Sequence, residues 1–134
     1  IYRILNAESA DVFVRNYVYY VAKPLDTDAM RRAAEYLKGT HDFKSFEAAG
    51  GTPRETTVRT IYDISVTGDR NIEIHVSGDG FLYNMVRIIT GTLVEVGKGR
   101  MATEYIEEII SSKDRTKAGP TAPPQGLYLA EVYY

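Results

Sequence analysis

The hydrophobic pattern of residues 58–97 changes its period once, and this change constrains the fold more than any other feature. Apolar and polar residues alternate over Val58–Thr67 and again over Asn71–Ser77, with a glycine-containing turn between the two runs. Such alternation predicts an antiparallel hairpin with one buried and one wet face. Over roughly Tyr83–Val96 the apolar residues instead fall three or four positions apart, as in an amphipathic helix, and Gly97 follows at the position of a C-cap glycine. A hairpin that leads directly into a helix favours an α+β domain.

The remaining segments complete the expected element order β(β)αββααβ. The hairpin residues expected to face the core are Val58, Tyr62, Ile64, Val66, Ile72, Ile74 and Val76. The other expected elements are strands at 1–5, 16–22 and 126–134, a helix between Asp26 and Gly39, a compact turn at 40–46 and a helix at 103–111. We therefore expect an antiparallel sheet that helices cover on one face, with the other face free for a ligand.

The composition excludes several classes of function. The 134 residues suffice for one domain with a sizeable core. The absence of cysteine excludes disulfides and zinc–thiolate sites, and a net charge of −2 excludes a general coating of nucleic acid, although not a local basic patch. The longest apolar run, Tyr17–Ala22, is too short to span a bilayer, so we expect a soluble, cytoplasmic protein. Since the sequence begins at Ile1 inside a predicted strand, we expect the domain 1–134 to be part of a longer chain.

No complete catalytic constellation is present in the sequence. Metal-ligand spacings, phosphate-binding glycine loops and the GxSxG elbow are all missing, so we expect neither metal nor cofactor. His41 beside Asp42 could form an acid–base pair, and Asp79 between two glycines could be catalytic, but both patterns are more typical of turns. The chain therefore does not read as a complete enzyme.

Arg87 is the one charge in an unusual position. It lies within the first turns of the predicted helix, where the positive end of the helix dipole gives a cation no advantage. An arginine cannot act as an acid or base near neutral pH, but it can clamp a carboxylate or phosphate through two parallel N–H groups. Two interpretations remain open from spacing alone: an arginine on the solvated side of the helix, or a partly buried arginine paired with an anion from another segment.

Residues 80–97 read GFLYNMVRIITGTLVEVG. This stretch resembles the GF-(L/V)-x-x-MVRxIxG-(T/S)-L-x-x-VG motif of the TruA family of tRNA pseudouridine synthases. Residues 24–46 and 113–129 are similar to further segments of that family, in the same order, so the resemblance covers nearly the whole chain.

The resemblance implies one lobe of the pseudouridine synthase fold. Members of the family isomerise uridine to pseudouridine in the anticodon stem-loop of tRNA, without cofactor or metal, and generally act as homodimers. Their catalytic aspartate lies in an R-(T/S)-D-x-G motif of the N-terminal half. Here Arg59 and Thr60 are followed by Ile61, so the chain resembles only the C-terminal half and is expected to be inactive without the N-terminal lobe.

The same resemblance implies roles for individual residues. The arginine of the MVR motif, Arg87, would pair with the catalytic aspartate. Tyr2, or a tyrosine preceding this sequence, would stack on the target base, and Phe81 and Leu82 would form part of the pocket wall. Residues 113–117, with Lys113 and Arg115, would contact the tRNA backbone. The alternative is a stand-alone RNA-binding or dimerisation module without catalysis.

Overall fold

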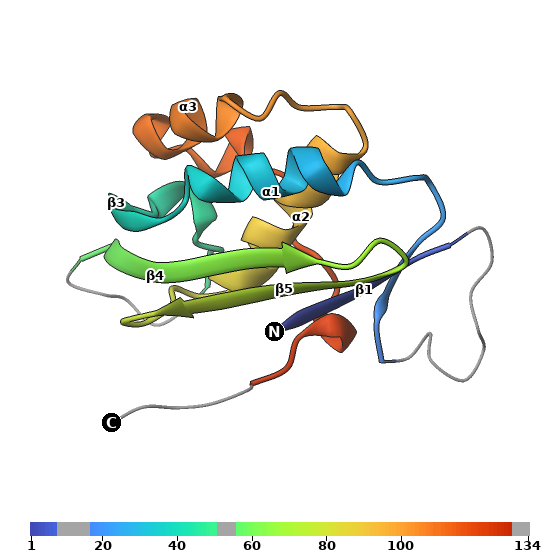
Figure 1. The fold of residues 1–134 in the computed structure, drawn as a ribbon. Helices are drawn as coiled ribbons and strands as arrows, with labels where there is room; N and C mark the ends of the chain where they lie inside the picture. Colours follow the sequence, from blue (N-terminus) through green and yellow to red (C-terminus); the bar gives the residue numbers. More distant parts are fainter. Residues whose placement is uncertain (8–16, 51–55, 130–134) are drawn as a thin grey trace.

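Residues 1–7, 17–50 and 56–129 are described by a computed structural model, in which five strands and three α-helices form two layers (Figure 1). The strands are β1 (Tyr2–Asn6), β2 (Tyr19–Val21), β3 (Gly39–Asp42), β4 (Val58–Thr67) and β5 (Asn71–Gly78). The helices are α1 (Thr27–Glu35), α2 (Met85–Gly97) and α3 (Tyr105–Ser112). Short 3₁₀ turns occupy Lys44–Phe46, Arg115–Lys117 and Pro124–Gly126.

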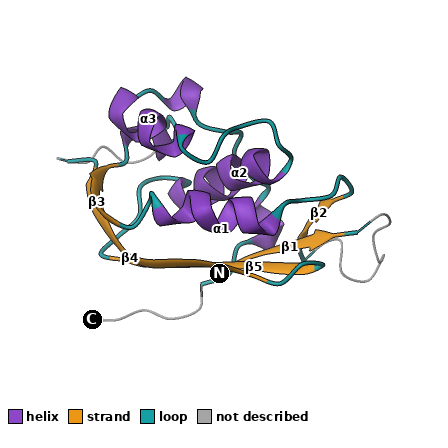
Figure 2. Cartoon of the chain, turned by 45° about the horizontal axis from the view of Figure 1, so that its top comes forward, coloured by secondary structure: helices purple, strands orange, loops and turns teal. Residues whose placement is uncertain are grey.

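The five strands form one sheet in the order β2-β1-β5-β4-β3. Figure 2 shows the three helices together on one face of this sheet, so the predicted α+β class with one helix-covered face is confirmed. The prediction of a wholly antiparallel sheet is wrong for one pair, because β1 and β2 are parallel, with Ile4 opposite Tyr19. Alternation shows which side chains face the core, but it carries no information about the direction of the neighbouring strand.

The β4–β5 hairpin is antiparallel as predicted, with Ile64 opposite Val76. An irregularity between Ile61 and Asp63 shifts its register. The side chain of Ile61 is therefore buried, whereas Tyr62, expected to face the core, is exposed. Such a bulge reverses which side chains face inward, and strict alternation cannot reveal it.

Two further segments differ from the expected elements. Part of the expected turn at 40–46 is instead strand β3, which pairs with β4. The residues of β3 are mostly polar, so they lack the hydrophobic alternation from which a strand is predicted, and backbone pairing with β4 forms the strand instead. Of the strand expected at 126–134, Leu127 makes a single antiparallel bridge with Tyr2, and residues 130–134 lie outside the described part of the chain. The pairing of both segments depends on residues distant in sequence.

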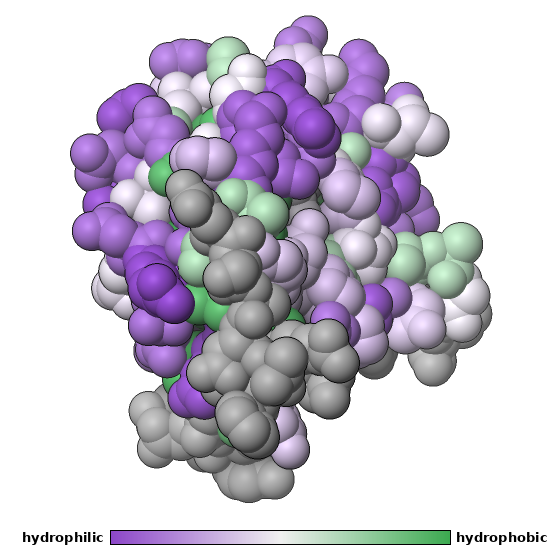
Figure 3. Space-filling view, turned by 90° about the vertical axis from the view of Figure 1, so that its right-hand side faces the viewer, coloured by the Kyte–Doolittle hydropathy of each residue, from purple (hydrophilic) through white to green (hydrophobic). Residues whose placement is uncertain are grey.

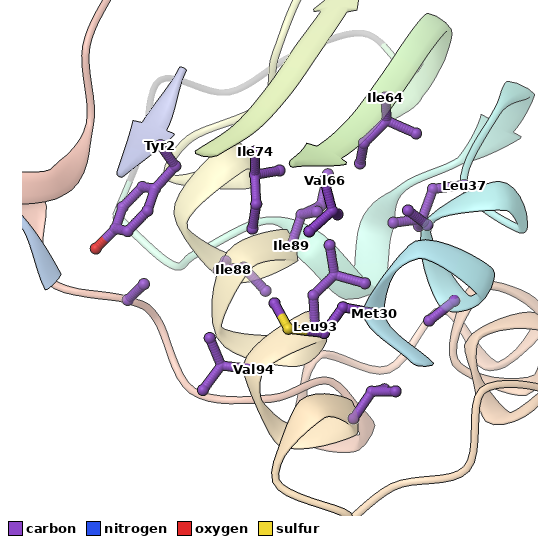
Figure 4. Packing of buried hydrophobic residues seen from close by; sticks show 14 of the residues in the cluster. Tyr2, Met30, Leu37, Ile64, Val66, Ile74, Ile88, Ile89, Leu93 and Val94 are labelled. Carbon is purple, nitrogen blue, oxygen red and sulfur yellow. The ribbon is translucent and has the colours of Figure 1, made fainter. Parts of the chain in front are cut away.

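The core lies between the sheet and helices α1 and α2. Helix α1 begins as predicted, since the Asp26 side chain accepts a hydrogen bond from Ala29 N at 3.0 Å. In Figure 4, Met30 of α1 and Leu93 of α2 point toward residues of the sheet such as Ile74, and all three are fully buried. In the side view of Figure 3, the upper part of the molecule, where the helix layer lies, is mostly hydrophilic, as expected for amphipathic helices.

Helix α2 is buried on nearly every side, because residues 118–123 cover the flank that the sheet does not. Gly119 N donates to Thr92 Oγ1 at 2.9 Å, and a Cβ atom on Gly91 would lie only 1.6 Å from the carbonyl oxygen of Pro120. The helix and this segment are thus in direct backbone contact. That contact brings the C-terminal part of the chain to the first turn of α2.

Candidate functional site

A surface pocket of about 570 Å³ lies where β5 ends and α2 begins. This volume is in the range typical of sites for small ligands. Its lining residues come from the chain start, β4, β5, the β5–α2 connection, the first turn of α2 and residues 127–129: Ile1, Asp63, His75, Val76, Ser77, Phe81, Leu82, Asn84, Met85, Val86, Arg87, Leu127, Tyr128 and Leu129. Apolar walls with a few charged groups can hold an uncharged ring and orient its polar edge.

Arg87 lies in this pocket and is held by hydrogen bonds on two sides. Its Nε donates to the carbonyl oxygen of Ala122 at 2.8 Å, and its Nη1 donates to Asn84 Oδ1 at 3.1 Å. Ala122 N in turn donates to the carbonyl oxygen of Arg87 at 3.0 Å. The interpretation of Arg87 as a freely solvated surface residue therefore does not fit, because its side chain is partly buried and fixed.

The outer guanidinium nitrogen of Arg87, Nη2, has no partner among the described residues. In the described part of the chain, every buried side-chain nitrogen or oxygen has a hydrogen-bond partner. Because Nη2 has none, it is open to solvent. None of the described ion pairs involves Arg87. The pocket thus presents a positive charge without a described counter-ion.

Phe81 and Leu82, which the resemblance implied as wall residues of the substrate pocket, both line this pocket, and their contact with a substrate stays a prediction. The ring of Phe81 is 40% exposed and could contact a ligand, whereas Leu82 is almost fully buried and supports the wall from behind. The connection that carries them leaves β5 at Gly78, where a Cβ atom would lie 2.7 Å from the carbonyl oxygen of Thr60. Glycine at this position lets the end of β5 pass this close to the backbone of β4.

Tyr2 does not belong to the pocket surface. Its side chain is fully buried, its ring lies edge-to-face with Tyr19 at 6.4 Å, and its hydroxyl donates to the carbonyl oxygen of Pro123. Burial raises the pKa of this hydroxyl well above its ordinary value. A ring enclosed in the core has no free face for a nucleobase, so we remove Tyr2 from the predicted substrate-binding residues. The weak alternation of a five-residue strand could not predict whether the Tyr2 ring would lie in the core or at the surface.

Lys113 and Arg115 lie outside the pocket lining. Arg115 Nη1 donates to the carbonyl oxygen of Gly119 at 2.9 Å, and its Nη2 donates to Thr121 Oγ1 at 3.2 Å. Arg115 therefore braces the segment that contacts Arg87, which sequence reasoning did not foresee. Lys113 is exposed, with Nζ 3.8 Å from Asp42 Oδ2, and its contact with tRNA remains a prediction.

The catalytic alternatives at His41 and Asp79 are explained by turn chemistry. His41 Nε2 is hydrogen-bonded to the carbonyl oxygen of Lys38 at 2.7 Å, and Asp79 Oδ1 accepts from Thr60 N at 2.9 Å. The hydroxyl of Thr57 donates to Asp42 and is the main reason that the pKa of this carboxyl is lowered. Among the described residues no hydrogen bond joins His41 to Asp42, and Asp79 binds the backbone of Thr60, so both sites fit the turn interpretation.

A small charged cluster borders the pocket on the helix-free face of the sheet, and no local pattern in the sequence predicts it. The Glu73 carboxylate lies 2.9 Å from His75 Nε2 and 3.2 Å from Arg3 Nε. The hydrogen bond from His75, followed by the charge of Arg3, lowers the pKa of Glu73. The guanidinium of Arg3 also lies over the ring of Tyr128, 4.6 Å from its centre. This stacking holds Tyr128 at the pocket rim.

Within residues 1–7, 17–50 and 56–129, no group of three or more histidine or acidic side chains is arranged to hold a metal ion. None of the helices described there is long and apolar enough to cross a membrane.

Comparison with known proteins identifies sequences related over the whole chain. The sequence model of a family described as tRNA pseudouridine synthase matches residues 33–134. The "tRNA pseudouridine synthase A 2" of Clostridium perfringens (strain 13 / Type A) is 54% identical over 134 residues, which cover 99% of this chain and 54% of that protein. The "tRNA pseudouridine synthase A 2" of Clostridium tetani (strain Massachusetts / E88) is 53% identical over 135 residues, covering 100% and 54%. The "tRNA pseudouridine synthase A" of Ruminiclostridium cellulolyticum is 51% identical over 135 residues, covering 99% and 55%. The chain thus spans about half the length of these relatives.

Proposed function

The chain belongs to the tRNA pseudouridine synthase family, and on that premise we propose that it forms the C-terminal lobe of an enzyme that isomerises uridine in the anticodon stem-loop of tRNA. The observation that carries this proposal is Arg87, a fixed cation in a pocket, with an open Nη2 and no described counter-ion. A guanidinium in this state is suited to a carboxylate supplied from outside the described residues. In the proposal that carboxylate is the catalytic aspartate of the other lobe.

The reaction defines what the pocket must do. The bond from N1 of uracil to C1′ of the ribose breaks, the base turns, and a bond from C5 to C1′ forms while C5 loses its proton and N1 gains one. Arg87 would keep the catalytic carboxylate ionised and oriented toward the nucleoside, because an adjacent opposite charge favours the ionised form. Phe81 and the apolar wall behind it would contact the displaced base.

Further parts of the proposal concern the whole enzyme. The N-terminal lobe would close the pocket from the side that Arg87 faces, and the complete protein would act on tRNA as a cytoplasmic homodimer. The length of the relatives supports the first part, since this chain spans about half of each. Exposed side chains at the pocket rim, among them Phe81, Leu127 and Leu129, would then be covered by the other lobe.

The test compares two arginine variants of the enzyme that carries this sequence as its C-terminal half. Loss of the charge pair in Arg87→Ala is expected to lower kcat/KM for a tRNA transcript by roughly 100-fold or more, as for other broken buried pairs. Arg70→Ala, at an exposed arginine in the β4–β5 turn, serves as the control and should act like the unaltered enzyme. Release of tritium from [5-³H]uridine in the transcript measures turnover directly.

Two results would contradict the proposal. Turnover by Arg87→Ala at the rate of the unaltered enzyme would exclude Arg87 as the clamp. Pseudouridine formation by the isolated chain would exclude the need for an aspartate from another lobe. Salt-dependent tRNA binding by the isolated chain, with full-length Arg87→Ala still active, would instead favour a stand-alone RNA-binding module.

A further inference from the structure

We infer that Asn84 is a positioning residue that orients Arg87, so that Arg87 receives its anion on the edge formed by Nη1 and Nη2. The inference rests on the proposed function, in which Arg87 pairs with a carboxylate. It adds a second residue to the site and a direction of approach for the anion.

The backbone of Asn84 has an unusual conformation. Its φ of 58° and ψ of 16° place it in the left-handed region, which of the described non-glycine residues only Asn84 and Lys113 adopt. Asparagine tolerates this region better than most residues do. The position directly precedes Met85, the first residue of α2. A left-handed residue there turns the chain sharply from the pocket wall into the helix.

The side chain of Asn84 does not serve the helix. An asparagine at a helix N-cap ordinarily accepts a hydrogen bond from a backbone N–H of the first turn. Asn84 forms no such cap, and its Oδ1 accepts from Arg87 Nη1 at 3.1 Å instead. The Asn84 side chain therefore binds the Arg87 guanidinium and does not cap helix α2.

Arg87 Nε is fixed from the opposite direction by the carbonyl oxygen of Ala122. Ala122 belongs to the segment that Arg115 braces through Gly119 and Thr121. Two independent parts of the chain thus hold the guanidinium, one before α2 and one after α3. A planar group held at two nitrogens has little freedom to rotate.

The remaining N–H groups define the open edge. A guanidinium has five N–H groups, of which one on Nε and one on Nη1 are used here. A carboxylate can bind through two parallel N–H groups either at the edge that includes Nε or at the edge formed by Nη1 and Nη2. Because Ala122 occupies Nε, the Nη1–Nη2 edge is the one left for such a pair.

The experiment uses the enzyme that carries this sequence as its C-terminal half, with a tRNA transcript as substrate. Asn84→Gly removes the amide while keeping a residue that adopts the left-handed backbone freely. We expect kcat to fall at least tenfold with less than a threefold change in KM, because tRNA binding is retained while the anion pair is misaligned.

An Arg87→Lys background separates positioning from stability. Lysine has no Nη1–Nη2 edge, so adding Asn84→Gly to Arg87→Lys should lower kcat less than twofold further. Thermal unfolding of each variant shows whether lost activity reflects unfolded protein. Normal kcat in Asn84→Gly, or an equal loss in both backgrounds, would overturn the inference. If Arg87→Ala is also fully active, the proposed function fails; if Arg87→Ala is inactive and Asn84→Gly is normal, only the role of Asn84 fails.

Discussion

Arg87 and Ala122 exchange two hydrogen bonds across 35 residues of sequence. Arg87 Nε donates to the carbonyl oxygen of Ala122 at 2.8 Å, and Ala122 N donates to the carbonyl oxygen of Arg87 at 3.0 Å. The pair connects the first turn of α2 to residues 118–123, and the orientation of the guanidinium therefore depends on that segment. Changes that move this segment should affect turnover even where they touch no substrate.

The first prediction concerns Gly91, where α2 and residues 118–123 meet most closely. A Cβ atom there would lie 1.6 Å from the Pro120 carbonyl oxygen, so Gly91→Ala must push the segment away from the helix. We expect a loss of about 2–3 kcal/mol in the free energy of unfolding, as for other overpacked sites, together with at least a tenfold lower kcat. Urea unfolding and tritium release measure the two effects.

Gly99→Ala is the matched control for this prediction. Gly99 has a positive φ of 79°, unlike Gly91 in helix α2, but no atom lies within 4 Å of an added Cβ. It should lose only about 1 kcal/mol, from backbone strain, and keep its turnover. Equal effects of the two substitutions on kcat would argue against the link through Pro120.

The second prediction follows from the buried hydroxyl of Tyr2. In Tyr2→Phe the carbonyl oxygen of Pro123 loses its donor, which should lower the free energy of unfolding by about 1–2 kcal/mol. Because the ring lies in the core and outside the pocket lining, KM for tRNA should change little. A large rise in KM with normal stability would instead show that the Tyr2 hydroxyl contacts the substrate.

The third prediction concerns stability at high pH. Burial raises the pKa of Tyr2 in the folded state above the ordinary value of 10.0, which the unfolded chain retains. The corresponding stabilisation is complete below pH 10 and is lost as the pH rises further, because the unfolded state then releases the proton more readily. Urea unfolding between pH 8 and 11 should therefore show a decline above about pH 10. That decline should be shallower in Tyr2→Phe, and an identical slope would contradict the assignment.

The fourth prediction separates the roles of Arg115 and Lys113. Arg115→Ala removes the brace on Gly119 and Thr121, so we expect a loss of about 1–3 kcal/mol in the free energy of unfolding. Lys113 is exposed, so Lys113→Ala should leave stability nearly unchanged. If Lys113 contacts a tRNA phosphate, its removal should reduce the slope of log affinity against log salt concentration by about one. An unchanged slope would exclude that contact.

The fifth prediction tests the exposed ring in the pocket. Phe81→Ala removes a surface on which a uracil could stack, worth about 1–3 kcal/mol per base, so kcat/KM should fall roughly 5- to 150-fold. Tyr62→Ala is the control, since Tyr62 is also an exposed aromatic residue but does not line the pocket. Equal losses in both variants would show that Phe81 has no special contact with the base.

Local patterns in the sequence were sufficient for the elements whose cause is local. The β4–β5 hairpin, helix α1 with its Asp26 cap and helix α2 all lie close to their predicted positions. Their signals, namely alternation, capping and a spacing of three or four, depend on neighbours within one or two turns. The position of Arg87 in the first turn of α2 was equally visible, and so was the motif that marks the family.

The features that were missed depend on contacts between distant segments. Strand β3 exists because β4 pairs with it, and the exposure of Tyr62 follows from a bulge that only the paired strand reveals. Arg115 acts as a brace because Gly119 and Thr121 fold back within its reach. No local pattern encodes such geometry.

The sequence by itself determined that this chain is an α+β member of the tRNA pseudouridine synthase family and that Arg87 is its unusually placed charge. The tertiary structure decided which N–H groups of Arg87 stay open, because Ala122 reaches that side chain from 35 positions away, where no sequence period extends. It also decided that Tyr2 is a core residue, because the chain after α3 closes over its hydroxyl. Sequence patterns specify which secondary structure a segment prefers and which of its side chains are buried. The orientation of a functional group depends instead on every segment that packs against it.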